Sequence, residues 1–68
     1  METLFQVNYR VNLNYGHLQS ITYADYQVFS DTRLARQRLE ALRKSNERLD
    51  TEYRWCDNYH LNTLVFVK

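Results

Sequence analysis

The first apolar and polar residues of the chain alternate strictly, which predicts a β-strand with one buried face over residues 4–13. The apolar members of this run are Phe5, Val7, Tyr9, Val11 and Leu13. Polar side chains separate them, as is typical of a half-buried antiparallel strand. Gly16, the only glycine of the chain, follows this run. Because it lies between two β-like runs, we expect a hairpin loop there.

The second β-like run, residues 18–29, alternates less regularly than the first. Ile21 and Tyr23 share a face, but the phase is lost at Ala24 and Asp25. An extra residue in one strand would restore the alternation, so we expect a bulge or bend near Ala24 and Asp25.

A helix is predicted from about Asp31 to about Arg48, after the capping sequence Ser-Asp-Thr at 30–32. Its apolar stripe consists of Leu34, Ala35, Leu39, Leu42 and Leu49. Arg38 falls within this stripe, so its charged group must reach past the core edge or meet a partner. No glycine or proline marks the end of the helix, and Asn46 is the candidate left-handed cap.

The end of the chain predicts two further strands, residues 51–56 and 59–67, joined by a tight turn at Asp57 and Asn58. The last run is apolar on both faces, which is typical of a strand covered on both sides. The order is therefore β-β-α-β-β. We expect an α+β fold in one domain, residues 1–68, with a mainly antiparallel four-stranded sheet and the helix on one face. The first and last strands are expected at its centre, and a three-stranded β-β-α-β sheet is the alternative if residues 51–58 are irregular.

The small size of the chain indicates that it needs help to be stable. At 68 residues, it buries only about 60% of its unfolded surface. Cys56 is the only cysteine, so an internal disulfide is excluded, and His17 and His60 with Cys56 match no zinc pattern. Stability is therefore expected to come from a homodimer or from a partner.

No catalytic, metal-binding or cofactor-binding motif is present in the sequence. Cys56 and His60 lie four residues apart, but in a predicted turn without an oxyanion site, so we interpret Cys56 as a small packing residue. We expect neither an enzyme nor a cofactor. No membrane span or secretory signal is visible, and the lone thiol suits a reducing compartment, so the expected location is the cytoplasm.

The predicted helix is the most basic part of a nearly neutral chain. Its charged residues are Asp31, Arg33, Arg36, Arg38, Glu40, Arg43, Lys44, Glu47 and Arg48. Arg36–Glu40, Glu40–Lys44 and Arg43–Glu47 are spaced as i,i+4 pairs, which are common on a solvated helix face. An acidic protein partner and a nucleic acid remain the alternatives, although a formal net charge of +1 argues against a strongly basic nucleic-acid binder.

Ten of the 68 residues are aromatic, and six of them are tyrosines. We assign Phe5, Tyr9, Phe29, Phe66 and one of Tyr53 and Trp55 to the core. Because so small a domain cannot enclose the rest, clustered surface tyrosines indicate a contact surface. The candidate contact tyrosines are Tyr15, Tyr23, Tyr26 and Tyr59. The candidate charged anchors are Arg36, Arg43 and Arg54.

The alternating start FQVNYRVNL, the capped helix SDTRLARQRLEALRK and the closing strand LVFVK resemble small single-domain proteins of phages and prophages. The resemblance implies an accessory protein that inhibits or modulates a host protein or a defence complex by stoichiometric binding. A nucleic-acid-binding regulator that uses the basic helix face and the sheet aromatics is the alternative function.

Overall fold

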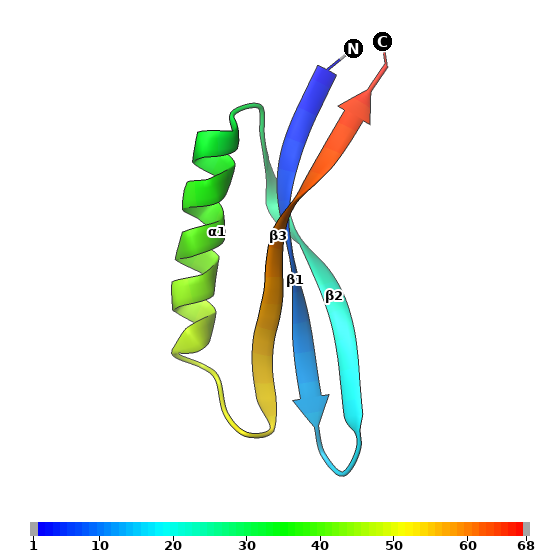
Figure 1. Ribbon diagram of the computed structural model, residues 1–68, viewed down its shortest axis with the longest axis vertical. Helices are drawn as coiled ribbons and strands as arrows, with labels where there is room; N and C mark the ends of the chain where they lie inside the picture. Colours follow the sequence, from blue (N-terminus) through cyan, green and yellow to red (C-terminus); the bar gives the residue numbers. More distant parts are fainter. Residues whose placement is uncertain (1, 68) are drawn as a thin grey trace.

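The computed structural model describes residues 2–67 and shows a three-stranded antiparallel sheet with one helix against it (Figure 1). The elements are β1 (Glu2–Asn14), β2 (Leu18–Phe29), α1 (Thr32–Glu47) and β3 (Arg54–Phe66). The strand order is β2-β1-β3, so β1 is hydrogen-bonded on both sides. The fold is α+β, as expected, but the predicted fourth strand is wrong.

The expected turn at Asp57 and Asn58 is a bulge inside one long strand. Asn8 pairs with His60 and Arg10 pairs with Asp57, so two residues of β3 stand opposite Tyr9 alone. Asn58 has φ 55°, the left-handed conformation that asparagine adopts in turns and bulges. The predicted turn is therefore wrong: the chain does not reverse at Asn58, and β1 remains the partner of β3 on both sides of the bulge.

The expectation that the last strand is central is also wrong. β3 is an edge strand, and β1 alone occupies the centre. The register of β3 with β1 places Leu61 opposite Val7 on one face of the sheet and Leu64 opposite Leu4 on the other. The helix covers only one of those faces (Figure 1), so the second apolar face of β3 has no covering element within residues 2–67.

The predicted irregularity in β2 is confirmed. Gln6 pairs with Val28, and Asn8 pairs with Ala24, so residues 25–27 stand opposite Val7 alone. Gln6 Nε2 donates a hydrogen bond to the backbone oxygen of Asp25 at 2.7 Å, across this bulge. The bulge turns the Asp25 carboxylate toward the helix, where Arg38 binds it.

The helix begins where the sequence predicts. Asp31 is its N-cap, and its Oδ1 accepts a hydrogen bond from the backbone N–H of Arg33 at 2.8 Å. The proposed left-handed cap at Asn46 is wrong, because the helix continues to Glu47 and its C-cap Arg48 has φ −68°. Asn46 instead lies inside the helix, and its Nδ2 donates to the Tyr59 hydroxyl at 3.0 Å.

The buried apolar core is very small. Among the residues described, only Val7, Val11 and Ala35 are buried hydrophobics. Phe66, which its alternation assigns to the core, is exposed at the end of β3. The radius of gyration is 13.8 Å, whereas a compact domain of this length has about 11 Å. The chain is therefore elongated and leaves much of its apolar surface in contact with solvent.

Arg38 meets a partner within the chain, and the resulting ion pair joins the helix to β2. Arg38 Nε and Nη2 donate to the two carboxylate oxygens of Asp25 at 2.8 and 3.0 Å. The Asp25 side chain is 5% exposed. Such a bidentate pair fixes both side chains in one geometry, and it connects the bulge of β2 to the middle of α1.

Replacing Asp25 with Asn is expected to lower the free energy of unfolding by about 2 kcal/mol at neutral pH, since it leaves Arg38 without its buried counter-charge. The hydrogen bonds from Arg38 hold the pKa of Asp25 below its ordinary value. The pair therefore stabilises the fold above pH about 4, and this stabilisation is lost as the pH falls through the lower folded pKa. Urea unfolding of both proteins should show the difference shrinking in acid. A difference that is constant with pH would contradict this role.

Replacing Asn58 with Val should destabilise the fold by about 1–2 kcal/mol, because a β-branched side chain is strained in the left-handed region. Asn58→Gly should retain the wild-type stability, since glycine adopts this conformation without strain. Thermal unfolding of the two variants is the measurement. Equal losses would mean that the Asn58 side chain, rather than its backbone conformation, matters.

Candidate functional site

Three tyrosines form a stacked row across the sheet. Tyr9 of β1 stacks on Tyr23 of β2 at 6.1 Å between ring centroids and on Tyr59 of β3 at 5.4 Å. Tyr59, a predicted contact residue, is half-buried, and its hydroxyl accepts the hydrogen bond from Asn46. Burial raises the pKa of Tyr59 above its ordinary value. This residue therefore helps to hold the helix on the sheet, while Tyr23 lies at the exposed end of the row.

A second tyrosine pair lies at the opposite end of the strands from the chain termini. Tyr15 in the β1–β2 hairpin stacks on Tyr53, which immediately precedes β3, with ring centroids 6.0 Å apart and planes within 5° of parallel. Tyr15 is 70% exposed and Tyr53 is 53% exposed. We call this pair the tyrosine tip. Figure 1 shows the β1–β2 hairpin and the segment before β3 at the lower end of the molecule, so the tip presents two large, exposed rings at that end.

Backbone hydrogen bonds hold the tyrosine tip in place. The N–H of Asn14 donates to the Tyr53 oxygen at 2.8 Å, joining the hairpin to the segment before β3. Thr51 Oγ1 accepts from the N–H groups of Tyr53 and Arg54 at 3.2 and 3.0 Å. The N–H of Thr51 donates to the Arg54 oxygen at 2.7 Å. These bonds make a closed turn that fixes the backbone beneath the Tyr53 ring.

Tyr26 is 82% exposed, more than Tyr15, Tyr53 or Tyr23. It lies in the bulge of β2, and the guanidinium carbon of Arg38 is 5.6 Å from its ring centroid. That distance is within the range of a cation–π contact. Tyr26 therefore packs against the Asp25–Arg38 pair on one side and is open to solvent elsewhere.

The outer face of the helix carries an ion-pair cluster centred on Arg43. Arg43 binds both Glu40 and Glu47 at 2.6 Å, which confirms the expected Arg43–Glu47 pair. The expected Arg36–Glu40 and Glu40–Lys44 pairs are absent among residues 2–67, because Glu40 is bound by Arg43 instead. This hydrogen bond lowers the pKa of Glu40. Within residues 2–67, neither Arg36 nor Lys44 forms an ion pair.

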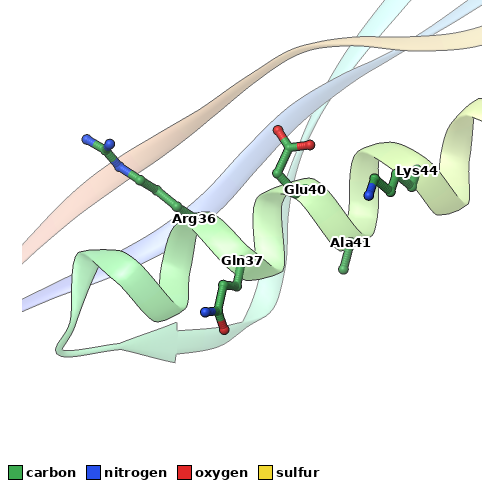
Figure 2. A pocket seen from close by; sticks show the side chains of 5 residues that line it. All are labelled: Arg36, Gln37, Glu40, Ala41 and Lys44. Atoms are coloured by element: carbon green, nitrogen blue, oxygen red, sulfur yellow. The ribbon is translucent and has the colours of Figure 1, made fainter.

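Figure 2 shows the side chains that line an open hollow on this outer face. They are Arg36, Gln37, Glu40, Ala41 and Lys44. The hollow has a volume of about 500 Å³ and is lined by helix residues alone. Because a catalytic or ligand pocket usually draws converging groups from several elements, we interpret this hollow as a gap above the small side chain of Ala41.

Cys56 and His60 do not form a nucleophile–base pair. Cys56 pairs with Val11, and His60 pairs with Asn8. These partners lie on opposite faces of β1, since they are three positions apart in the strand. The His60 ring lies instead with Nδ1 2.9 Å from the Asn58 oxygen.

The open face of the sheet is polar at its centre. Arg10 binds Asp57 through two hydrogen bonds of 2.8 and 2.9 Å, and these lower the pKa of Asp57. Next to this pair, the buried Asn12 accepts from Ser20 Oγ at 2.7 Å. Because these groups are paired with one another, the centre of this face presents no free charge within residues 2–67.

The predicted contact residues do not converge on one surface. Only Tyr15 lies at the tyrosine tip, with Arg54 following Tyr53 in the chain. Tyr23 and Tyr26 lie on β2, Tyr59 packs beneath the helix, and Arg36 and Arg43 lie on its outer face. Tyr53 was missed as a contact residue, because its alternation with Trp55 indicated a core position in a strand. The strand begins only at Arg54, so Tyr53 lies outside it.

The described residues 2–67 contain no group of three His, Cys, Asp or Glu side chains that could hold a metal ion. Within the same residues, α1 is neither long nor apolar enough to cross a membrane. The sequence matches no protein-family model, no curated protein and no solved structure.

Replacing Tyr59 with Phe should lower the free energy of unfolding by about 1 kcal/mol, because it removes the hydrogen bond from Asn46 and leaves that amide poorly satisfied. Tyr26→Phe is the matched control, and it should leave stability unchanged because the Tyr26 ring is largely solvated. Equilibrium denaturation of the two variants measures the difference. Equal stability of Tyr59→Phe and the wild type would refute the structural role of Tyr59.

Proposed function

We propose that the protein is a small, non-enzymatic protein-binding module that docks on a larger protein through the tyrosine tip. The observation that carries the proposal is the exposed, parallel stack of Tyr15 and Tyr53. Tyrosine supplies a large, rigid and amphipathic contact area, and it is enriched among the residues that dominate binding energy. Two such rings at one end of the molecule make a compact anchor.

The fixed geometry of the tip supports binding at low entropic cost. Ordering flexible side chains and loops on association reduces affinity. Here the bonds from Asn14 and Thr51 already hold the backbone around Tyr53. The stack also restricts both rings before any partner arrives. The tip is therefore organised in the free protein, as expected of a surface that binds rather than of a disordered loop.

The proposed partner is a host protein or a defence complex in the cytoplasm, inhibited or modulated by stoichiometric occupation of its surface. The resemblance to phage and prophage accessory proteins supports this choice of partner. Arg54 follows Tyr53 in the chain and adds a positive charge to this segment. Aromatic rings flanked by arginine are the residue types most enriched at the centres of protein interfaces.

The alternative is a nucleic-acid-binding regulator, favoured by Arg36 and Lys44 on the outer face of the helix, which form no ion pair within the part of the chain that the structure describes. Phosphate contacts require such free cations. The aromatic residues available for base stacking lie elsewhere, on the hairpin and on β2. The basic surface and the aromatic surface are thus separate, and this separation favours the protein partner.

The test is affinity capture from host lysate with the wild type and with the Tyr15→Ala, Tyr53→Ala double variant. We expect the wild type to retain one stoichiometric protein and the double variant to lose it by at least about tenfold, since two interface anchors are removed. Phe66→Ala is the matched control, because Phe66 is also an exposed aromatic but lies at the other end of the molecule. It should capture the partner as the wild type does.

Nuclease treatment of the lysate separates the two functions. Retention of the protein after nuclease supports direct protein binding. Recovery that depends on nucleic acid, or equal capture by the tip variant and the wild type, would overturn the proposal. Circular dichroism of the double variant confirms that it is folded before the comparison is made.

A further inference from the structure

The outer edge of β2 is an unpaired strand edge. In the order β2-β1-β3, one side of β2 pairs with β1 and the other has no partner within residues 2–67. Figure 1 shows the half of β2 next to the hairpin along the edge of the sheet that lies farther from the helix. Because an open edge offers free backbone N–H and C=O groups, it can accept another strand.

The segment Leu18–Ala24 of this edge lacks the features that protect strand edges from pairing. It is seven residues long, follows β1 in regular register, and contains no charged residue and no proline. Charges, prolines and bulges are the usual means of blocking such pairing. In the edge strand β3 these features are confined to residues 54–60, where the Asn58 bulge interrupts the strand and Arg54, Asp57 and His60 lie.

We propose that Leu18–Ala24 pairs antiparallel with the same segment of a second copy, joining two sheets into one of six strands. The register that pairs the whole segment has its twofold axis at Ile21. Ile21 then lies opposite Ile21 of the other copy, and Thr22 lies opposite Ser20. The bulge at residues 25–27 ends the pairing, so the contact is limited to this segment.

A second copy suits this edge because the segment is self-complementary. No like charges meet in the antiparallel register, and Thr opposite Ser is a favourable cross-strand pair. Ile21 and Tyr23 lie on the same face of the sheet as the helix, and they are 46% and 45% exposed. The same residues of the second copy continue this apolar surface across the axis, so both sets lose contact with water.

A stable interface buries about 800 Å² on each partner, so the paired strands must also bring exposed apolar side chains into contact. Leu18, Ile21 and Tyr23 supply exposed apolar surface on the segment. Within residues 2–67 the buried apolar core consists of Val7, Val11 and Ala35, and a chain of this size usually gains stability from association.

The first test measures mass by sedimentation equilibrium over a range of concentrations. The wild type should approach twice 8.3 kDa. Ile21→Lys should weaken the dimer by on the order of a hundredfold, because each dimer loses two apolar contacts and gains two facing charges. Val65→Lys is the control, since Val65 is comparably exposed but lies on β3, and it should remain dimeric.

The second test fixes the register by disulfide formation in a Cys56→Ser background. Ile21→Cys should crosslink under mild oxidation, because residues opposite each other at the axis have Cα atoms about 5 Å apart, within disulfide range. Gln19→Cys should not crosslink, since its two copies would lie about 13 Å apart along the strands. A monomeric wild type, crosslinking at Gln19 without Ile21, or dissociation by Val65→Lys alone would overturn the proposal.

This dimer does not depend on the tyrosine tip. The Tyr15→Ala, Tyr53→Ala variant should lose the captured partner but keep the dimer mass, whereas Ile21→Lys should lose the dimer mass. The two measurements therefore distinguish failure of the edge pairing from failure of the proposed binding function.

Discussion

The ion pair between Asp25 and Arg38 is the interaction on which the rest of the structure depends. A three-stranded sheet and one helix share a core of three small apolar side chains, too little to hold the helix in place by burial alone. The bulge in β2 turns a carboxylate toward the helix, and Arg38 binds it through two short hydrogen bonds. The hydrogen bond from Asn46 to Tyr59 anchors the helix to the opposite edge strand. Two polar contacts, one to each edge strand, thus supplement the core.

This arrangement explains why so many aromatic rings remain at the surface. The helix covers one face of a long, narrow sheet and extends over only part of its length (Figure 1). Tyr9 and Tyr59 pack beneath it, whereas the hairpin and the segment before β3 extend beyond it. The rings at that end stack on each other instead of entering a core. A surface that is ordered but does not contribute to the core is free to be used in recognition.

The local signals in the sequence predicted most of the fold, and the pairing of distant segments accounts for the errors. Strict alternation identified β1, the Ser-Asp-Thr cap placed the start of α1, and the broken phase at Ala24 and Asp25 located the bulge. The sequence predicted a turn at Asn58 because asparagine adopts the left-handed conformation in turns and in bulges alike. Only the register with β1 distinguishes the two. The exposure of Tyr53 could not be predicted either. It follows from the closed turn at Thr51, and the alternation of apolar and polar residues does not reveal such a turn.

The central claim is that stability resides in the sheet, the bulge and the Asp25–Arg38 pair, and that the tyrosine tip, the proposed binding surface, contributes little to it. Thermal unfolding of the Tyr15→Ala, Tyr53→Ala variant beside Asp25→Asn tests this division most directly. The account predicts that the tip variant unfolds at nearly the wild-type temperature and that Asp25→Asn unfolds well below it. A tip variant that unfolds as early as Asp25→Asn would show that the stacked tyrosines maintain the fold, and would contradict the account.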